Sequence, residues 1–279
     1  MDSQSTGGGA GAGHAVAAAP LPVSAPSLWS DRIDATALPC HDVTLPGIAA
    51  NLALDEALLI EADEGRGPPV VRFWEPSEFA VVLGATRRLR DEVHLKACHA
   101  DGVPVFRRSS GGGTVLIGPG TLNVTVVLSD TAGPGLSAVD AAQQHVLGRM
   151  AGAIRRAGAA VDVRAHGDLV LGDRKCGGSA QRRLRRWFLV HCSILYDFPI
   201  DRIPRYLAMP ALQPEYRRER PHIDFLCNLP LSRAALVDAL RPGDAPCPSS
   251  GDAAPSGPGA LLPALLADRF ANPEWIERF

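Results

Sequence analysis

The sequence lacks long hydrophobic runs and a dominant charge. None of its apolar stretches approaches the roughly 20 residues that a helix needs to cross a bilayer, so we expect no membrane-spanning segment. Lysine and arginine together number 28 and aspartate and glutamate 30, which gives a net charge of -2 over 279 residues. A chain this close to neutral is not expected to bind nucleic acid through bulk charge. Its length allows one or two domains with a sizeable core.

Paired cysteines are also missing. The six cysteines are scattered singly and no Cys-x-x-Cys pair occurs, so neither a zinc site nor a redox dithiol is indicated. No basic region precedes apolar residues near the start of the chain, so a secretory signal is not indicated either. We therefore expect reduced thiols and a cytoplasmic location.

Lysine is scarce. Of the 28 basic residues only two are lysines, Lys96 and Lys175. A lysine ammonium is a compact point charge on a stem that can reach into a site. A lysine among so many arginines either has a functional role that requires an ammonium group or occurs there by chance. Lys175 is the candidate that matters, because it lies in a glycine-rich stretch and Lys96 does not.

Composition divides the chain into four parts. Residues 1–30 are mostly glycine, alanine, serine and proline, and they predict a disordered tail. Residues 40–241 carry regular apolar patterns and predict one folded domain. Residues 242–260 are rich in proline, glycine and serine and predict a flexible insertion. Residues 261–279 regain apolar character and predict a segment that packs back on the domain.

Hydrophobic periodicity predicts helices over residues 51–60, 91–101, 137–158, 201–209 and 232–240. The helix over 137–158 is predicted to begin with a capping box of Ser137 and Asp140 and to bury Val139 and Met150 on one face. Strands are predicted over 70–74, 79–83, 103–106, 122–128, 161–163, 168–171, 174–180 and 187–196. Because regular strand–helix alternation is missing, we predict an α+β (α/β) fold with a mixed, largely antiparallel sheet flanked by helices.

A glycine-rich stretch between two predicted strands is the first candidate site. It reads Arg107-Arg108-Ser109-Ser110-Gly111-Gly112-Gly113-Thr114. Three consecutive glycines suit a place where the backbone approaches a ligand closely, and free amides on such a loop form an anion-binding concavity. The two arginines add charge in a fork geometry. A glycine-rich hairpin turn with solvated arginines is the alternative, since short glycine motifs often match by chance.

More motifs follow this stretch along the chain. They are Leu122-Asn123, Gly172-Asp173-Arg174-Lys175, Gly178-Ser179-Ala180-Gln181 and His191. In their order and approximate spacing these motifs resemble the lipoate–protein ligases, which share a superfamily with biotin–protein ligases and octanoyltransferases. Residues 51–56 look like that family's first helix, and Trp74 and Gly84 match its early strands. The resemblance covers residues 45–235 and implies a single catalytic domain of the biotin/lipoate ligase type, here over residues 40–241.

The resemblance implies an activity. Lipoate or octanoate would react with ATP and Mg²⁺ to give an acyl adenylate, which passes its acyl group to a lysine of a carrier domain. The implied partner is a lipoyl-carrier domain protein, such as a 2-oxoacid dehydrogenase subunit or the glycine-cleavage H protein. Positioning and electrostatics would supply most of the rate, with no protein nucleophile required.

The resemblance also implies roles for single residues. Lys175 is the implied catalytic residue, between the acyl carbonyl and the α-phosphate. Asp168 is implied to hold Mg²⁺ or orient the nucleotide, and His191 to orient the mixed anhydride. The acyl slot is implied beside Trp74, Val82 and the strand around Leu189. The other implied cofactor-binding residues are Arg107, Arg108, Ser110, Gly111, Gly112, Gly113, Asn123 and Ser179.

Purely structural roles stay open for several of these residues. Asp168 could be a turn cap, His191 a satisfied core histidine, and Trp74 a core side chain. The basic run over residues 181–187 is either a solvated hairpin or a surface that receives an acidic carrier domain.

Some positions depart from the ligase pattern and keep a rival activity open. Ile117-Gly118 replaces the family's His-Asp, and the local Gly118-Pro119-Gly120 is more similar to the octanoyltransferases. The rival is ATP-independent octanoyl or lipoyl transfer through a cysteine thioester, which needs an activated thiolate. The related transferases carry that cysteine shortly before the lysine motif, where residues 161–166 contain none. A non-catalytic carrier-binding module is a third possibility, and a biotin ligase is disfavoured because its glycine motif differs.

Overall fold

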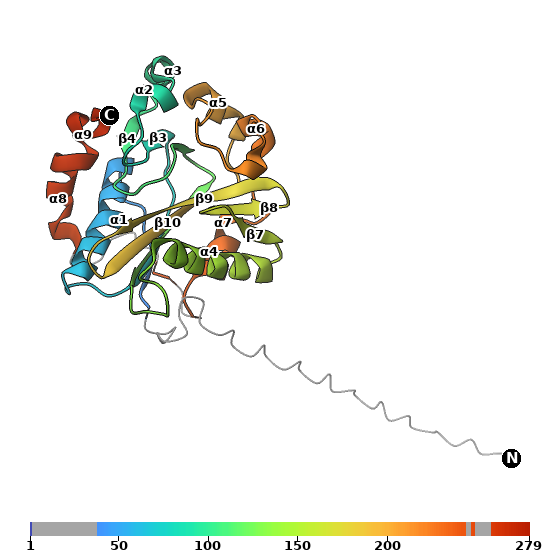
Figure 1. Ribbon diagram of the computed structural model, residues 1–279. Helices are drawn as coiled ribbons and strands as arrows, with labels where there is room; N and C mark the ends of the chain where they lie inside the picture. Colours follow the sequence, from blue (N-terminus) through green and yellow to red (C-terminus); the bar gives the residue numbers. More distant parts are fainter. Residues whose placement is uncertain (2–37, 244–246, 249–257) are drawn as a thin grey trace.

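The computed structural model describes Met1 and residues 38–243, 247–248 and 258–279. The predicted tail over residues 2–30 and most of the predicted insertion over 242–260 lie outside the described residues. A seven-stranded sheet forms the middle layer of the domain (Figure 1). Helix α1 (Ile48–Asp63) packs on one face of this sheet and α4 (Val139–Arg156) on the other.

The large sheet has the strand order β1-β2-β6-β10-β9-β8-β7. Of the neighbouring pairs described in it, β1 and β2 run parallel and the others run antiparallel. A second sheet, β4-β3-β5, combines one parallel and one antiparallel pair. The predicted α+β fold with a mixed, largely antiparallel sheet is confirmed. The strands are β1 (Cys40–Asp42), β2 (Val70–Trp74), β3 (Ala80–Leu83), β4 (Val105–Arg107), β5 (Val115–Ile117), β6 (Thr121–Ser129), β7 (Val161–Arg164), β8 (Asp168–Leu171), β9 (Arg174–Arg183) and β10 (Trp187–Leu195).

Side-chain alternation along β6 separates two cores. Val124 and Val126 pack with Met150 of α4 in the larger apolar cluster. The alternate residues of β6 point to the opposite face of the sheet. Val127 is one of them and packs there with α1. Asn123 lies on this second face, so the polar residues of the sheet and α1 meet on the same side.

Helix α1 is buried on nearly all sides because it lies between the large sheet and the C-terminal helices. Its Asp55 carboxylate forms an ion pair with Arg72 of β2, and both side chains are buried. Arg72 also donates to the Asn51 carbonyl group, at 3.1 Å. Removing one partner of such a buried pair leaves an uncompensated charge and costs roughly 3–5 kcal/mol.

Short helices gather at one end of the domain, at the top of Figure 1. They are α2 (Leu89–Glu92), α3 (Leu95–Asp101), α5 (Ile203–Tyr206) and α6 (His222–Phe225), with α7 (Arg233–Leu240) lying against α4. The single helix predicted over residues 91–101 is wrong. Val93 is extended there and bridges to Leu207, so the chain breaks into α2 and α3.

The start of α4 also differs from its prediction. The helix begins after Ala138, and no side chain caps it, so the capping box of Ser137 and Asp140 is wrong. Val139 is 53% exposed and does not join the apolar face with Met150. It lines the cavity described below instead.

The C-terminal segment packs along α1 and β4. It consists of α8 (Leu262–Leu265), a π-helical turn η5 (Leu266–Phe270) and α9 (Pro273–Glu277). Leu265 and Phe270 enter the same apolar cluster as Ile48 of α1 and Trp74 of β2. Figure 1 shows α8 and α9 beside α1, so this segment forms an outer layer over the first helix.

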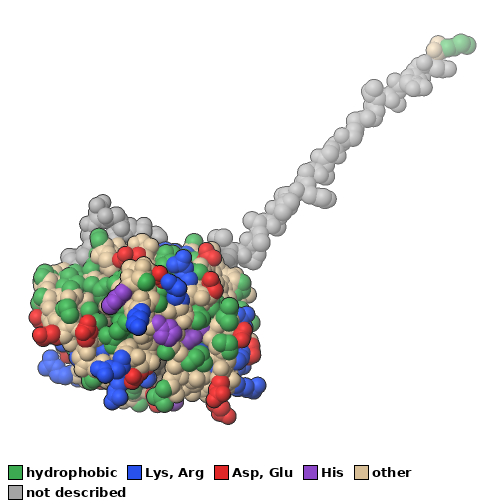
Figure 2. Space-filling model, turned by 90° about the horizontal axis from the view of Figure 1, so that it is seen from above, with side chains coloured by type: hydrophobic (Ala, Val, Ile, Leu, Met, Phe, Trp, Pro, Cys, Tyr) green, Lys and Arg blue, Asp and Glu red, His purple; other side chains and the backbone are tan. Residues whose placement is uncertain are grey.

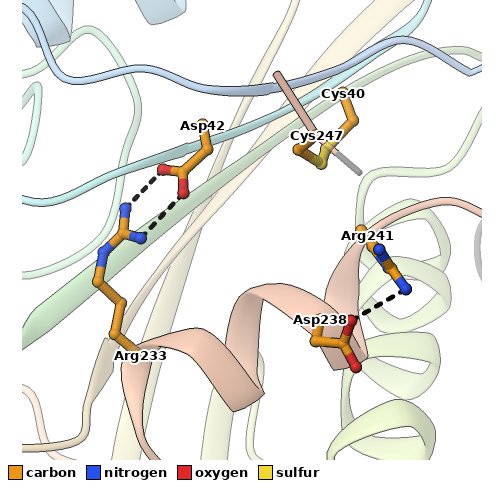
Figure 3. The surroundings of a disulfide bond; sticks show 6 residues. All are labelled: Cys40, Asp42, Arg233, Asp238, Arg241 and Cys247. Carbon is orange, nitrogen blue, oxygen red and sulfur yellow. Dashed lines mark hydrogen bonds and ion pairs between the residues drawn. A yellow bond between two sulfur atoms is a disulfide. The ribbon is translucent and has the colours of Figure 1, made fainter. Parts of the chain in front are cut away.

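A disulfide joins Cys40 of β1 to Cys247, with Cα atoms 5.0 Å apart (Figure 3). The expectation that all thiols are reduced is therefore wrong for this pair. Singly placed cysteines gave no sign of it, because the two are separated by 207 positions in sequence. Next to the disulfide, Arg233 of α7 forms an ion pair with Asp42. Across the described ranges, no helix combines the length and apolarity needed to span a bilayer.

Candidate active site

A cavity of about 1100 Å³ opens between the two sheets and the segment over residues 208–217. Gly111–Gly113 line one side of it, and Lys175 with Gly177–Gln181 lines another. The two glycine-rich motifs singled out in the sequence therefore line one cavity. Its apolar end is lined by Leu52 of α1 and Trp74 of β2.

Two arginines hold the glycine loop by its carbonyl groups. Arg108 Nη2 donates to the carbonyls of Gly111 (2.6 Å) and Gly113 (2.8 Å), and Arg87 Nε donates to that of Gly112 (2.9 Å). Burial and the Arg87 charge lower the pKa of Arg108 to about 10, so it stays a cation at neutral pH. Within the described residues, nothing accepts from the amides of the three glycines. These amides are therefore free to bind an anion.

Close approach explains a second glycine beside this loop. A Cβ atom at Gly84 would lie 2.2 Å from the Gly112 carbonyl oxygen, so any side chain there displaces the loop. Gly112 itself has a φ of 86°, which residues with side chains rarely adopt. The match of Gly84 to the family's early strands thus has a steric reason.

Arg107 does not reach the cavity. It is fully buried, and its guanidinium donates to the carbonyls of Gly84 (3.0 Å), Arg87 (2.6 Å) and Ile276 (2.7 Å). Neighbouring residues at a strand end point to opposite sides, so Arg108 faces the glycine loop and Arg107 faces the C-terminal segment. The structure therefore corrects the assignment of Arg107 to a ligand and gives it a tie between the loop over 84–87 and α9.

Lys175 lies in an ion pair with Asp168, with Nζ 2.6 Å from Oδ1. The second carboxylate oxygen of Asp168 accepts from the hydroxyl of Tyr216, at 2.7 Å. All three residues line the cavity. The Lys175 side chain folds back over Gly178, whose lack of a Cβ atom leaves the space it occupies.

Several polar residues of the cavity are cross-strand neighbours, in one row that runs perpendicular to the strands of the large sheet. Pairing across the strands aligns Asp168 with Gly178, Gly178 with Ser193, Ser193 with Asn123, and Asn123 with Trp74. Residues directly opposite each other in an antiparallel pair point to the same face, so this row runs along the floor of the cavity. The charged end of the row is the Lys175–Asp168 pair, and its apolar end is the Trp74 ring.

Asn123 is oriented by its neighbour in that row. The Ser193 hydroxyl donates to Asn123 Oδ1 at 2.7 Å, which assigns Nδ2 as the free donor. Nδ2 is buried and has no partner among the described residues. A buried amide donor without an acceptor costs free energy, so a ligand acceptor at this position would relieve that cost.

His191 connects the sheet to the glycine loop. Its Nε2 lies 2.7 Å from Ser110 Oγ, and that hydroxyl accepts from Arg108 Nε at 3.0 Å. Burial and the Arg108 charge lower the pKa of His191 to about 3, so the ring is neutral and accepts the Ser110 proton. Both His191 and Ser110 therefore fix the loop, and His191 also lines the cavity.

Ser179 lies on the α4 side of β9. Its hydroxyl donates to the Gly167 carbonyl (2.9 Å) and accepts from Gln143 Nε2 of α4 (2.8 Å). A Cβ atom at Gly167 would lie 2.4 Å from that Gln143 nitrogen, so glycine suits this crowded turn. The Ser179 side chain thus secures the turn before Asp168.

The donors present do not form a resident magnesium site. Both Asp168 oxygens already accept from Lys175 and Tyr216. The described part of the chain contains no group of three histidine, cysteine, aspartate or glutamate residues arranged to hold a metal ion. A direct Asp168–Mg²⁺ contact would have to share this carboxylate with both donors.

Free thiols are kept away from the cavity. Cys98, Cys176, Cys192 and Cys227 are unpaired and buried, and no cysteine of the described ranges lines the cavity. Burial raises the pKa of Cys192 to about 12. A thiol with so high a pKa is protonated at neutral pH and is a poor nucleophile.

Sequence reasoning missed several residues of the cavity. Ser193 follows His191 by two positions on β10, so the period of a strand could have identified it. Arg87 lies in an irregular segment and Tyr216 in a short 3-10 helix (Glu215–Arg217), and no sequence signal pointed to either. Leu189, assigned to the acyl slot, instead packs in the cluster under α1.

The cavity brings together a glycine loop with unpaired amides, a lysine and apolar side chains. The family model for the lipoyl protein ligase A/B catalytic domain matches residues 47–229. The chain belongs to this family and is an enzyme of the lipoate ligase and octanoyltransferase group.

Individual relatives include both activities. A putative lipoate-protein ligase A of Aeropyrum pernix is 34% identical over 169 residues, which cover 61% of each chain. The octanoyltransferase LipM of Brevibacillus brevis is 27% identical over 265 residues, which cover 81% of this chain and 94% of that protein. The chain therefore spans less than two thirds of the A. pernix relative and nearly all of the B. brevis one.

Solved structures share the fold. The bipartite lipoate protein ligase of Thermoplasma acidophilum superposes with a TM-score of 0.71 at 20% identity, over 86% of this chain and 96% of that chain. A lipoate-protein ligase A bound with ATP gives a TM-score of 0.69 at 21% identity, over 86% and 98%. The predicted catalytic-domain type is confirmed by these matches.

Proposed function

We propose that this enzyme attaches lipoate or octanoate to a lysine of a carrier domain in an ATP-dependent reaction through an acyl adenylate. Family membership supports lipoyl or octanoyl attachment. The observation that carries the ATP-dependent form is the pairing of free glycine amides with Lys175 in one cavity. Such a cavity suits a substrate with a polyanionic part and a carboxylate next to each other.

The reaction has two steps. In the first, a carboxylate oxygen of the acid attacks the α-phosphorus of ATP, an O–P bond forms, and the bond to the β-phosphate oxygen breaks to release pyrophosphate. In the second, the carrier lysine amine attacks the acyl carbon, an amide bond forms, and AMP leaves while the amine proton passes to solvent. ATP brings Mg²⁺ with it as part of the substrate.

The residues of the cavity divide the work in this proposal. The amides of Gly111–Gly113 bind phosphate oxygens, and the Arg108 cation holds the loop that carries these amides. Lys175 stabilises the charge that develops between carboxylate and α-phosphate, and its ion pair with Asp168, which also lines the cavity, supports this role. Asn123 Nδ2 donates to an oxygen of the bound substrate.

The acyl chain would occupy the apolar end of the cavity. Leu52, Trp74, Val82 and Ile117 line this end, and they come from α1 and both sheets. Burying apolar surface contributes about 25 cal/mol per Å², which suits a medium-chain acid more than a polar one. Asp55 also lines this end, and its Oδ2 accepts from Trp74 Nε1 at 3.2 Å, so the ring orientation is fixed.

The second candidate is ATP-independent octanoyl transfer through a cysteine thioester. The nearly full-length similarity to the B. brevis octanoyltransferase favours it. The burial of all four free cysteines away from the cavity favours the ligase. For the transferase, one of these buried thiols would have to reach the cavity before it could attack as a thiolate.

The carrier partner follows from the same proposal. One solved relative is described together with its E2 lipoyl domain. We propose a lipoyl domain of a 2-oxoacid dehydrogenase subunit or a glycine-cleavage H protein as the acceptor here. Figure 2 shows acidic and basic side chains interspersed on one face of the molecule, so on that face no single-sign field dominates.

Intact-mass spectrometry of a purified lipoyl domain tests this function. The enzyme is incubated with the domain, ATP, Mg²⁺ and free lipoate or octanoate, or with octanoyl-loaded acyl carrier protein and no ATP. The ligase predicts acylated lipoyl domain only in the first mixture. Acylation only in the second mixture, lost when all four free cysteines are replaced by serine, would establish the transferase instead.

A further inference from the structure

Tyr216 stands outside every motif, yet it contacts the Lys175–Asp168 pair. Its hydroxyl donates to Asp168 Oδ2 at 2.7 Å while Asp168 Oδ1 pairs with Lys175 Nζ at 2.6 Å. We infer that Tyr216 is a positioning residue, which acts through Asp168 to hold the Lys175 ammonium at the reacting carboxylate. The inference rests on the proposed function and adds a residue to it.

The Tyr216 ring contacts two neighbouring side chains. It packs against Phe225 with ring centroids 5.2 Å apart, and the Arg164 guanidinium lies 5.7 Å from its centroid. Burial and the nearby Asp168 charge raise the pKa of Tyr216 above its ordinary value. The phenol therefore keeps its proton and remains a donor over the working pH range.

The backbone of Tyr216 is tied to the hairpin that carries Lys175. Arg220 Nη2 donates to the Tyr216 carbonyl (3.0 Å) and to the Asp173 carbonyl (2.8 Å). Between them, Arg218 and Glu219 both have positive φ angles, 51° and 58°. Two consecutive non-glycine residues in this region are strained, and such strain is kept where the surrounding contacts over-determine the geometry.

The same segment then reaches Lys175 directly. Leu226 forms a bridge with Lys175, and the Cys227 amide donates to the Lys175 carbonyl at 2.9 Å. The segment over residues 215–227 therefore holds Lys175 twice, once by its backbone and once through the Tyr216–Asp168 contact to its ammonium. Without the hydroxyl, Asp168 would keep one donor and could turn about its side-chain bonds, and Lys175 would turn with it.

Tyr216→Phe removes the hydroxyl and keeps the ring in contact with Phe225 and Arg164. One charge-assisted hydrogen bond justifies an expected fall in kcat of about 10-fold, with KM for acid and ATP unchanged within about twofold. Tyr206→Phe is the matched control, because Tyr206 also donates to a carboxylate, Asp101 Oδ2 at 2.8 Å, but does not line the catalytic cavity. We expect Tyr206→Phe to leave kcat unchanged.

A double-mutant cycle separates positioning from general support of the fold. If Tyr216 acts through Asp168, then Tyr216→Phe lowers kcat by less than about twofold in an Asp168→Asn background. Tyr206→Phe is expected to have no effect in either background. A full loss on adding Tyr216→Phe to Asp168→Asn, or an equal kcat for Tyr216→Phe and the unchanged protein, would overturn the inference.

The two lysines of the chain allow a test that does not depend on activity. With ¹⁵N- and ¹³C-labelled lysine, NMR should show two side-chain ammonium groups, and Lys96 is exposed and serves as the internal reference. Tyr216→Phe and Asp168→Asn are each expected to shift the Lys175 signals and leave Lys96 unmoved. An unmoved Lys175 in Tyr216→Phe would refute the positioning role even in an active enzyme. Shifted Lys175 signals in a protein that neither forms adenylate nor transfers acyl groups would instead refute the proposed function.

Discussion

The Lys175 ammonium occupies the space that a side chain on Gly178 would need. A Cβ atom built at Gly178 would lie 2.8 Å from Lys175 Nζ and 2.9 Å from its Cε. The two residues are three positions apart on β9, and the lysine folds back along its own strand to reach Asp168. The Lys-x-x-Gly spacing in the motif is therefore a steric requirement of the ion pair.

Gly178→Ala is expected to displace Lys175 from Asp168 and to lower the rate of adenylate formation by about 10- to 100-fold. The free energy of unfolding should fall by less than about 2 kcal/mol, because the lysine can swing out to solvent. Gly148→Ala in α4 is the control, since nothing lies within 4 Å of its Cβ position. Steady-state kinetics and urea unfolding check both variants. A Gly178→Ala enzyme with full activity would contradict the steric account.

We expect the loss of Arg107 to lower stability and the loss of its neighbour Arg108 to weaken ATP binding. Arg107→Ala leaves several buried carbonyls without a donor, so we expect a loss of about 3 kcal/mol or more in unfolding free energy. Proteolysis should then cleave first within residues 261–279, because α9 loses its tie to the loop over 84–87.

Arg108→Gln is expected to raise KM for ATP about 10-fold or more. The account fails if Arg107→Ala raises KM for ATP at unchanged stability.

The different roles of these two arginines show how far sequence reasoning reached. Both belong to the motif, and the sequence predicted a glycine loop there with both arginines at the ligand. Which arginine faces the cavity depends on the phase of β4 against a C-terminal segment more than 160 positions away, as the bond from Arg107 to Ile276 shows. Local sequence does not contain that phase.

The other features that sequence reasoning missed also depend on packing between distant parts of the chain. Tyr216 enters the cavity from a single 3-10 turn and Arg87 from an irregular loop, and tertiary packing sets the path of both. Val139 fits the apolar period of α4, but it is the first residue of the helix and lines the open cavity, where it stays exposed. The Cys40–Cys247 disulfide joins positions that no spacing rule connects. By contrast, the sheet followed from alternation and turn chemistry, which act over a few residues.

His191 predicts a pH dependence of stability. Its pKa is about 3 in the folded protein against an ordinary value of 6.5. Between these pH values the unfolded chain binds one more proton, so folded-state stability falls as pH drops below 6.5, by up to about 1.4 kcal/mol per pH unit. His191→Gln should reduce this slope in urea unfolding between pH 7.5 and 5. His222, with a pKa lowered to about 4 by burial, contributes to the same slope. Part of the pH dependence of the unfolding free energy should therefore remain in His191→Gln. An unchanged slope would contradict a neutral buried His191.

The disulfide predicts a dependence of stability on reductant. Cys40→Ser with Cys247→Ser should lower the unfolding free energy by about 2–4 kcal/mol, since the bond closes a very long loop. Reductant should lower the stability of the unchanged protein to the same level and leave the double variant unaffected. Because β1 lies at the far edge of the sheet from the Lys175 hairpin, kcat should not change. Equal stability of all forms would show that the bond does not support the fold.

The central claim is that the glycine loop and Lys175 activate a carboxylate with nucleotide, and ATP–pyrophosphate exchange measures this step without any carrier. We predict exchange that requires lipoate or octanoate, falls at least about 100-fold in Lys175→Ala and is unchanged in Lys96→Ala. No exchange with either acid, in an enzyme that still transfers octanoyl groups from acyl carrier protein without ATP, would contradict the claim.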